Sequence, residues 1–391
     1  MTELKVVATI LNPELTDIPI ERLRRRRSSK WARYSADVLP AWVAEMDFPL
    51  AGPVKLALAE AVQLDDCGYA SPQELDLAGA FADFADRRLG WSVDEAQVSP
   101  SSDVVGAIRS LLRVLTKPGD RIVINTPVYH PFFTLIEELD CDLAEAPLAA
   151  EGLDPEAIER QFAAGASALI LCSPHNPTGG VPSREQLAAI ADSAARYGAW
   201  VLADEIHAPL ALPGARHVPF LTVSEAASER GIALCSASKA FNIAGLRCAQ
   251  IVTASTNAAA VIARLCVSDR SCGHLGAIAS VAAFRDGGPW LDDVIAVLDH
   301  NRRLLGELLD ARLPQVRYTR PQAGYLAWLD LRALELGEDP SAVILERCKV
   351  ALSPGPSFGR QGVGFARLNI GTSPALLEEA VERIAKVVHR G

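Results

Sequence analysis

Long apolar runs are missing from this sequence. No stretch reaches about 18 apolar residues, so no membrane-spanning helix is expected. The start of the chain, residues 1–10, is short and contains Glu3 and Lys5, so we expect no secretory signal. An excess of basic residues is missing as well: the formal net charge is −10, which argues against nucleic acid as a partner.

The sequence also lacks the common metal and redox patterns. None of its eight cysteines forms a C-x-x-C pair, and no two histidines have metal-ligand spacing. Cys172 and Cys235 fall in predicted buried strands, where a thiol behaves as a small hydrophobic group. We therefore expect reduced thiols, a cytoplasmic protein and no metal site. The glycine-rich segment 359–364 does not match G-x-G-x-x-G, which disfavours a nicotinamide-dependent dehydrogenase.

What the sequence does contain is enough apolar material for two domains. The chain has 391 residues, of which 49% are hydrophobic and 22% charged. We expect a large domain over residues 48–275. A smaller domain is expected from residues 1–47 together with residues 276–391. The basic run at residues 21–30 is interpreted as a solvated face.

Short apolar strands alternate with helices through the middle of the chain. Residues 121–125, 167–172, 199–203 and 232–235 are the predicted strands. Fully apolar strands of this kind predict an α/β fold with a mixed, mostly parallel sheet covered on both faces. A short strand is also expected at residues 39–49. Beyond residue 276, long helices near 290–313 and 374–388 flank alternating strands at 325–330 and 363–371, which indicates a smaller α+β domain.

Polar side chains follow four of the predicted strands. They are Tyr129, Asn176, Asp204 and Lys239. Ligands of open α/β sheets bind outside the carboxyl ends of the strands, so these four side chains are expected to meet in one crevice.

The segment around Lys239 has the residue types needed to bind an aldehyde that carries a phosphate. A strand at 232–235 leads into Ser236, Ser238 and Lys239, and Arg247 follows. An amine in apolar surroundings can have a lowered pKa and attack a carbonyl. Hydroxyl groups and a guanidinium bind phosphate. Pyridoxal 5′-phosphate satisfies both requirements. A surface lysine after a strand is the alternative.

Three further strand-end residues suit the ring of such a cofactor. Asp204 would keep a pyridinium nitrogen protonated, unless it is a helix cap or part of a core ion pair. Asn176 would donate to the phenolate oxygen of the ring, or it is a turn residue. Tyr129 would stack on the face of the ring, and His207 would touch the same ring.

Two more positions complete the candidate site. The helix that starts after Ser102, with Val104 in its first turn, would bind the phosphate through its backbone N–H groups. Arg367 lies on a strand of the smaller domain, and its planar guanidinium suits a substrate α-carboxylate. The alternative for Arg367 is a surface salt bridge.

Several motifs of the chain resemble those of a known family. The motifs S-P-H-N-P-T-G (173–179), D-E-I-H (204–207), S-A-S-K-A-F-N-x-x-G-L-R (236–247) and F-A-R-L-N-I-G (365–371) resemble those of fold type I pyridoxal-phosphate enzymes of the class I/II aminotransferase family. The resemblance covers roughly residues 20 to 391. It implies a Schiff-base lysine, a pyridinium partner, a phenolate donor, a stacking ring, a phosphate ligand and a carboxylate ligand. In that order, these are Lys239, Asp204, Asn176, Tyr129, Arg247 and Arg367.

Tyr69, in C-G-Y (67–69), resembles the tyrosine that reaches the phosphate of the neighbouring subunit. The resemblance therefore implies a homodimer with shared active sites. Tyr69 would also be in place to assist proton transfer.

Within the family, the likeness is to the cystathionine β-lyase subgroup of MalY/PatB type. It rests on W-V-A-E-M-D-F-P (42–49), C-G-Y (67–69), P-V-Y-H-P-F-F (127–133) and D-E-I-H (204–207). Asp103 is a departure, because the subgroup usually has glycine there. A carboxylate beside a phosphate is repulsive unless it points away.

The subgroup implies α,β-elimination from cystathionine, cystine or another cysteine S-conjugate, with Lys239 as the general base. Two alternatives share these residues. One is an aminotransferase acting on an amino acid, and the other is a non-catalytic regulator built on the same fold.

Overall fold

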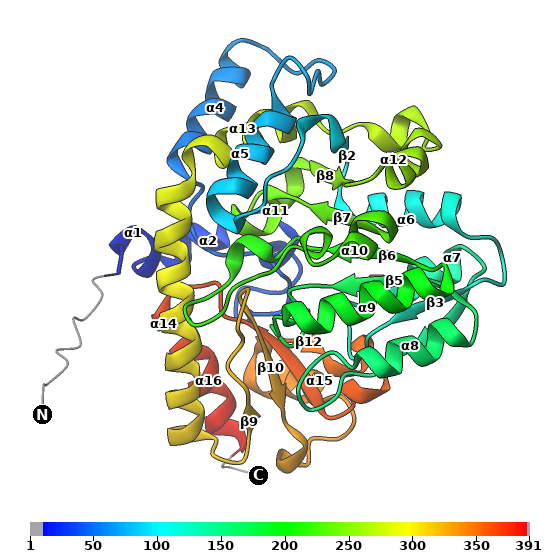
Figure 1. Cartoon of the computed structure of the whole chain (residues 1–391). Coiled ribbons are helices and arrows are strands. Elements are labelled where there is room, and N and C mark those ends of the chain that lie inside the picture. The colour runs from blue at the N-terminus through cyan, green and yellow to red at the C-terminus, as the bar shows by residue number, and fades with distance from the viewer. Residues whose placement is uncertain (1–10, 389–391) are drawn as a thin grey trace, which may run out of the picture.

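A seven-stranded sheet forms the centre of the molecule, in a computed structural model that describes residues 11–388 (Figure 1). The strand order is β2-β8-β7-β6-β5-β3-β4. β8 pairs antiparallel with both of its neighbours, and the remaining pairs are parallel, as the sequence pattern predicts. The strands are β2 (Val98–Ser101), β3 (Arg121–Ile124), β4 (Asp142–Glu145), β5 (Ala166–Cys172), β6 (Trp200–Asp204), β7 (Gly231–Cys235) and β8 (Ala249–Val252).

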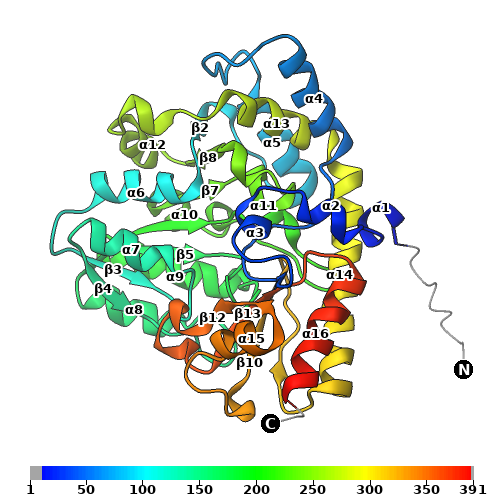
Figure 2. The same ribbon diagram turned by 180° about the vertical axis from the view of Figure 1, so that it is seen from behind.

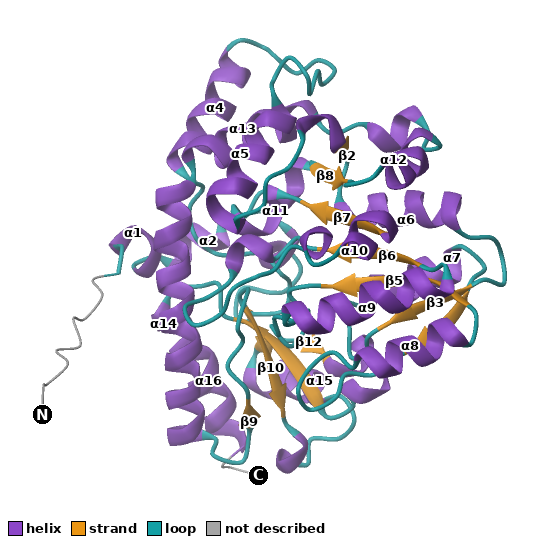
Figure 3. Cartoon of the chain, viewed as in Figure 1, coloured by secondary structure: helices purple, strands orange, loops and turns teal. Residues whose placement is uncertain are grey.

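Successive residues of the central strands pack on opposite faces of this sheet, because side chains alternate along a strand. Ile122 and Ile124 belong to one apolar core, and Val123 between them belongs to the other. Helices cover both faces (Figure 3). The first core is completed by α6 (Val104–Leu115), α7 (Pro131–Glu138) and α12 (Thr256–Ala263). The second is completed by α4 (Gly52–Gln63), α5 (Leu77–Leu89), α8 (Pro155–Ala163), α9 (Arg184–Tyr197), α10 (Glu225–Arg230) and α13 (His274–Asp286).

A second, antiparallel sheet lies below the first in Figure 1. Its strand order is β12-β13-β10-β9. The long helix α14 (Gly288–Arg312) runs along the edge of the molecule from the α4 and α5 region to this sheet (Figure 1). The remaining elements here are β9 (Arg317–Tyr318), β10 (Leu326–Asp330), β12 (Ser353–Pro354), β13 (Phe365–Asn369), α15 (Pro340–Cys348) and α16 (Pro374–Val388).

The N-terminal segment folds back onto this second part. Figure 2 shows its short helices facing the viewer. Its first strand, β1, pairs in parallel with β11 far along the chain. The segment contains α1 (Pro13–Thr16), α2 (Ile20–Arg24), α3 (Ser29–Ala32) and β1 (Leu39–Pro40), and β11 is Val350–Ala351. The prediction that no leader peptide is present falls on residues 1–10, which lie outside the described range.

The basic run at residues 21–30 is not simply a solvated face, and this corrects the sequence-based interpretation. Lys30 is buried and its Nζ lies 2.8 Å from the buried Asp47 Oδ2. The Trp31 indole also donates to Asp47, over 2.8 Å. Arg26 donates to the Asp47 carbonyl over 2.8 Å. The run therefore contains two cations that hold the segment 42–48.

The expected strand at residues 39–49 is also wrong beyond Pro40. Residues 42–48 are held by side chains from both parts of the molecule and not by another strand. Every backbone carbonyl from Trp42 to Phe48 accepts a hydrogen bond from a side chain. The donors are Arg26, Lys30, Lys239, Asn242, Tyr325, Ser353, Arg367 and Asn369. Satisfied carbonyls make this segment a fixed wall for whatever lies beside it.

Among the described residues, no helix combines the length and apolar character needed to cross a membrane.

Candidate active site

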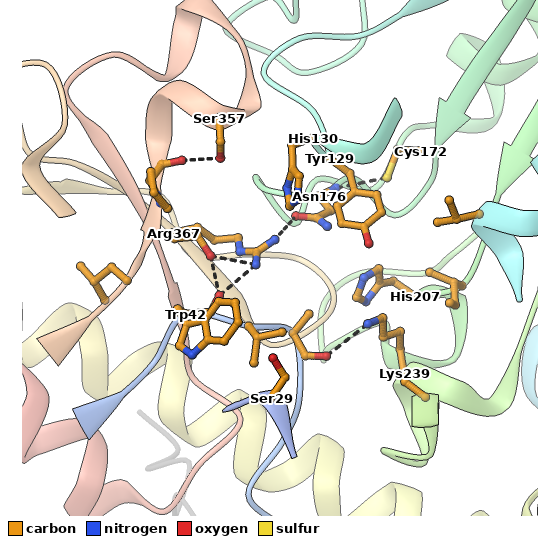
Figure 4. Close-up of a pocket in the computed structure, with 18 of the residues that line it drawn as sticks. Ser29, Trp42, Tyr129, His130, Cys172, Asn176, His207, Lys239, Ser357 and Arg367 are labelled. Atoms are coloured by element: carbon orange, nitrogen blue, oxygen red, sulfur yellow. Dashed lines mark hydrogen bonds between the residues drawn. The ribbon is translucent and has the colours of Figure 1, made fainter. Parts of the chain in front are cut away.

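A cavity of ≈ 710 Å³ lies where the two sheets face each other, at the carboxyl ends of the central strands. This volume is in the range of small-molecule sites. The structure places Tyr129, Asn176, Asp204 and Lys239 around the cavity, although they follow four different strands. Arg367 enters it from β13 of the second sheet (Figure 4).

Lys239 lies in the short helix α11 (Ala237–Ala240), directly after β7. Its Nζ donates to the Ala44 carbonyl oxygen over 3.1 Å (Figure 4). Burial lowers the pKa of Lys239 to about 8, and the nearby Arg367 cation adds to the shift. A substantial share of this amine is therefore neutral near pH 8, which is the form that attacks a carbonyl or removes a proton.

Asp204 ends β6 and is buried. Its Oδ1 accepts a 3.2 Å hydrogen bond from the Ile206 amide, and no ion pair to Asp204 occurs within residues 11–388. Burial raises the pKa of Asp204 to about 7. A carboxylate in this state is stabilised by a cation brought into the cavity.

His207 and Tyr129 contribute rings to the same space. The two side chains and Lys239 project into it together in Figure 4. Burial lowers the pKa of His207 to about 3, so its imidazole is neutral. Its Nδ1 is buried without a hydrogen-bond partner among the described residues, and the ring packs edge-on against Tyr325 with centroids 6.0 Å apart. An unpaired ring nitrogen and two aromatic faces suit a flat heteroaromatic ligand.

Arg367 is buried, with only 4% of its surface exposed, and is not a surface salt bridge. Its Nη1 donates to Asn176 Oδ1 over 2.9 Å, and its Nη2 donates to the Trp42 carbonyl and to Ser353 Oγ over 3.0 Å each. Its Nε is buried and unpartnered within the described part of the chain. Burial lowers the pKa of Arg367 to about 10. A buried guanidinium bound to neutral groups is a site for an anion.

The opposite end of the cavity has hydroxyl groups and a helix start. Ser236 Oγ lies 2.8 Å from Ser238 Oγ and 2.6 Å from the Cys248 carbonyl oxygen. Ser238 and Val104, the first residue of α6, line the cavity. The backbone N–H groups at the start of α6 and the Ser238 hydroxyl form the kind of cup that binds phosphate, whereas Ser236 does not line the cavity and its hydroxyl accepts from the Ser238 amide.

Arg247 is also at this end, and it is paired with Asp103. Arg247 Nη2 lies 2.6 Å from Asp103 Oδ2. The other oxygen, Oδ1, accepts a 2.8 Å hydrogen bond from the Gly106 amide and caps α6. The carboxylate that departs from the family pattern therefore has a structural role, and its charge is partly balanced by the guanidinium.

Tyr69 is not brought to the cavity of its own chain. It lies in the loop after α4 and is 100% exposed. Sequence reasoning missed other residues that line or hold the cavity: Arg33, Tyr34, Asp339 and Ser353. None of these four is part of a recognisable motif. The carbonyls of Trp42 and Ala44 were also missed, although both residues belong to the segment W-V-A-E-M-D-F-P.

No group of three or more His, Cys, Asp or Glu side chains in the described range has the arrangement of a metal site.

A mostly parallel α/β sheet with a lysine, a buried carboxyl group and a helix start at its strand ends is typical of the aminotransferase-like fold of pyridoxal-phosphate enzymes. The family model for aminotransferase class I and II matches residues 51–384. The chain belongs to this family.

Relatives named as cystathionine β-lyases match this chain over most of its length. The chain is 38% identical to a cystathionine β-lyase of Corynebacterium glutamicum, over 94% of this chain and 99% of that protein. It is 34% identical to the cystathionine β-lyase PatB of Bacillus subtilis, over 92% of this chain and 96% of that protein. Among solved structures, cystalysin from Treponema denticola, which contains pyridoxal 5′-phosphate, has a TM-score of 0.90 and 27% identity. That match covers 97% of this chain and 99% of cystalysin.

The residues of the cavity fit pyridoxal 5′-phosphate. Asp204 is a buried carboxyl group that forms no ion pair within residues 11–388, and a pyridinium nitrogen would supply one. The imidazole of His207, which lines the cavity, and the Tyr129 ring suit the flat faces of the cofactor ring. The cup of Ser238 and the start of α6 suits the phosphate, and Lys239 suits the aldehyde.

Proposed function

We propose that this chain is a pyridoxal-phosphate-dependent C–S β-lyase that cleaves cystathionine or other cysteine S-conjugates to pyruvate, ammonia and a thiol. The observation that carries the proposal is the single cavity shared by the lysine Lys239, the buried anion Asp204 and the buried cation Arg367. The assignment to C–S cleavage is supported by relatives named cystathionine β-lyase that match more than nine-tenths of the chain.

In this proposal Lys239 binds the cofactor aldehyde and Asp204 pairs with the pyridinium nitrogen. Asn176 donates to the phenolate oxygen, Tyr129 stacks on the ring and His207 lies against it. Val104, Ser236, Ser238 and Arg247 hold the phosphate. When bound, pyridoxal 5′-phosphate supplies a cationic ring that withdraws electrons from the substrate Cα.

The proposed role of Arg367 is to orient the substrate. Its guanidinium is fixed by Asn176, Ser353 and the Trp42 carbonyl, and its Nε has no partner in the described part of the chain. A substrate α-carboxylate would satisfy this cation and so fix the position of Cα. With its carboxylate bound to Arg367 and its amine bound to the cofactor, the substrate would present its Cα–H bond to Lys239.

Lys239 then moves the proton. With cofactor and substrate bound, the Lys239 amine would accept the Cα proton, and its pKa, lowered to about 8, leaves about half of the amine neutral at pH 8. The Ala44 carbonyl, 3.1 Å from Nζ, holds the amine in place without neutralising it. A thiolate is a good leaving group, so the β-carbon–sulfur bond breaks without a dedicated acid.

The test is an assay of purified protein with L-cystathionine and L-cystine in the absence of any keto acid. We expect pyruvate and ammonia in equal amounts from both substrates, together with homocysteine from L-cystathionine and thiocysteine, a persulfide, from L-cystine. None of these products should form with Lys239→Ala. A half-reaction that bleaches the cofactor and needs a keto acid to recover would identify an aminotransferase and overturn the proposal. A folded protein with no absorption from bound cofactor would identify a non-catalytic protein.

We also propose a homodimer in which Tyr69 of each chain completes the other chain's site. Large apolar side chains are exposed on α4 and the loop after it: Leu56, Val62, Leu64 and Tyr69. Apolar groups gathered in this way support an interface. Tyr69 does not line the cavity of its own chain, which is consistent with a role in a neighbouring one.

Two further assignments remain proposals. The large domain would span residues 48–275 and the small domain residues 1–47 and 276–391; the proposal is supported by the seven-stranded sheet, whose strands fall within residues 98–252, and the four-stranded sheet, whose strands fall within residues 317–369. A cytoplasmic location is supported by the eight cysteines, all of which are free thiols.

A further inference from the structure

The cavity has a further set of lining residues, an outer wall, that no proposed catalytic step uses. The wall is formed by residues in and just after α3, in and just before α15, and in β12, which lie far apart in sequence. It contains one basic and one acidic side chain, Arg33 and Asp339. We call this region the outer wall; its other members are Ser29, Tyr34, Ser341, Ala342, Leu345 and Pro354.

Arg33 is held in place by aromatic rings and not by a carboxylate. Its guanidinium carbon lies 4.7 Å from the centre of the Trp42 ring and 5.7 Å from that of Tyr34. No ion pair to Arg33 occurs within residues 11–388. Stacking leaves the N–H groups at the edge of the guanidinium free to bind an anion.

The backbone that carries Arg33 is anchored to the active site. Lys30 in α3 forms the buried ion pair with Asp47, and Trp31 donates to the same carboxylate. Arg33 stacks on Trp42, and the backbone carbonyl of Trp42 accepts a hydrogen bond from Arg367. The outer cation is thus tied to the inner one through a single residue, so their separation is set by the fold.

Asp339 is similarly fixed and similarly lacks an ionic partner. It caps α15, with Oδ1 accepting from the Ser341 amide over 3.1 Å and from Ser341 Oγ over 2.5 Å. No basic side chain within the described range forms an ion pair with it. Its second oxygen, Oδ2, is left to accept from a ligand in the cavity.

We propose that Arg33 and Asp339 determine substrate specificity by binding a second amino-acid group, a carboxylate and an ammonium, at the far end of the S-substituent. This inference rests on the proposed C–S lyase function. It narrows the substrate class to cysteine conjugates in which the departing thiol is itself an amino acid, and it disfavours simple S-alkyl cysteines. The inner Arg367 binds the α-carboxylate, and the outer pair binds the matching group beyond the sulfur.

Matched substrates test each charge separately in the holoenzyme. S-propyl-L-cysteine has a neutral tail, S-(2-carboxyethyl)-L-cysteine has only the carboxylate, and S-(2-aminoethyl)-L-cysteine has only the ammonium. The variants are Arg33→Gln, Arg33→Lys and Asp339→Asn, of which the last keeps the helix cap. kcat/KM is measured from pyruvate formation, and substrate affinity is measured from the change in cofactor absorption.

Arg33→Gln should lower kcat/KM about tenfold for the carboxyethyl substrate and for L-cystathionine, mainly through KM, because one charge-assisted contact is lost. Arg33→Lys should recover part of that loss. Asp339→Asn should lower kcat/KM for the aminoethyl substrate in the same way. All variants should match the wild type on S-propyl-L-cysteine.

An equal loss on all substrates, or no loss on any, would overturn the inference. Pyruvate formed from S-propyl-L-cysteine tests the lyase function independently of the outer wall. If none of the substrates yields pyruvate, the proposed function fails. The substrate affinities measured from cofactor absorption would then still show whether Arg33 and Asp339 bind the charged end of the S-substituent.

Discussion

Arg367 on β13 donates a 2.9 Å hydrogen bond to Asn176, which follows β5 of the other sheet. The bond joins the two sheets across the cavity, between the proposed carboxylate ligand and the proposed donor to the cofactor ring. The contact therefore links the proposed substrate-binding residue to a proposed cofactor-binding residue. Changes at Arg367 should consequently affect substrate binding before they affect folding.

Arg367→Lys keeps the positive charge but loses the planar, two-pronged donor. Lysine cannot reach Asn176 and Ser353 and also bind a carboxylate in the same geometry. We expect kcat/KM for L-cystathionine to fall by about 100-fold, close to 3 kcal/mol, mainly through KM. Steady-state kinetics checks this, with Arg360→Lys as the matched control because Arg360 is exposed. A fall in kcat alone would contradict a carboxylate-binding role.

The pKa of Lys239, lowered to about 8, predicts how the cofactor-free enzyme takes up pyridoxal 5′-phosphate. Only the neutral amine attacks the aldehyde. The rate of covalent uptake should therefore rise with pH below about 8 and level off above it. Stopped-flow absorbance measures this rate, with Nα-acetyl-lysine as the control, whose rate should still be rising near pH 10. A protein rate that rises in parallel with the control would show that the amine is unperturbed.

Asp103→Asn removes the carboxylate charge at the phosphate end and keeps the helix cap. The substitution frees Arg247, which now lies 2.6 Å from Asp103, and removes repulsion toward the phosphate. We expect the dissociation constant for pyridoxal 5′-phosphate to fall about tenfold. Absorbance titration of the cofactor-free protein gives this constant. Weaker binding would instead mean that Asp103 positions Arg247 for the phosphate.

Lys30→Met leaves Asp47 buried without its cation. Breaking a buried pair in this way should lower the free energy of unfolding by about 3–5 kcal/mol. Lys30→Met with Asp47→Leu should recover part of the loss, since no uncompensated charge remains. Urea unfolding measures both variants. Arg24→Ala, in the same basic run but exposed, should stay within about 0.5 kcal/mol of the wild type.

Leu56→Asp combined with Leu64→Asp places charge on the apolar surface of α4 and its following loop. Light scattering after size exclusion should show a shift from dimer to monomer, accompanied by loss of activity because the partner's tyrosine is no longer supplied. Leu143→Asp is the matched control, because Leu143 is also exposed but lies on the edge strand β4. A wild-type monomer with full activity would contradict the shared site.

The fold was readable from the sequence wherever local pattern and final structure coincide. The apolar strands that became β3, β5, β6 and β7 are short and almost entirely buried, and such strands have few alternatives to a covered parallel sheet. The same pattern places Tyr129, Asn176, Asp204 and Lys239 after strand ends from the sequence alone.

Other features depend on contacts between distant segments and leave no local trace. Residues 42–48 look like an edge strand, yet their carbonyls bind side chains such as Asn369 and Lys239. The basic run looks solvated in the sequence because no local pattern indicates that Lys30 pairs with Asp47. Arg33 and Asp339 line the same cavity because α3 ends and α15 begins beside it, and these two helices are far apart in sequence.

The pairing of β1 with β11 has a consequence for synthesis of the chain. Leu39 finds its partner only when Val350 has left the ribosome, whereas the seven-stranded sheet is complete once Val252 has emerged. The segment that forms the wall of the active site is therefore made first and placed last. It must wait for roughly tens of seconds at ordinary translation rates. Truncation near the C-terminus would leave a well-formed central sheet with an unfinished catalytic cavity.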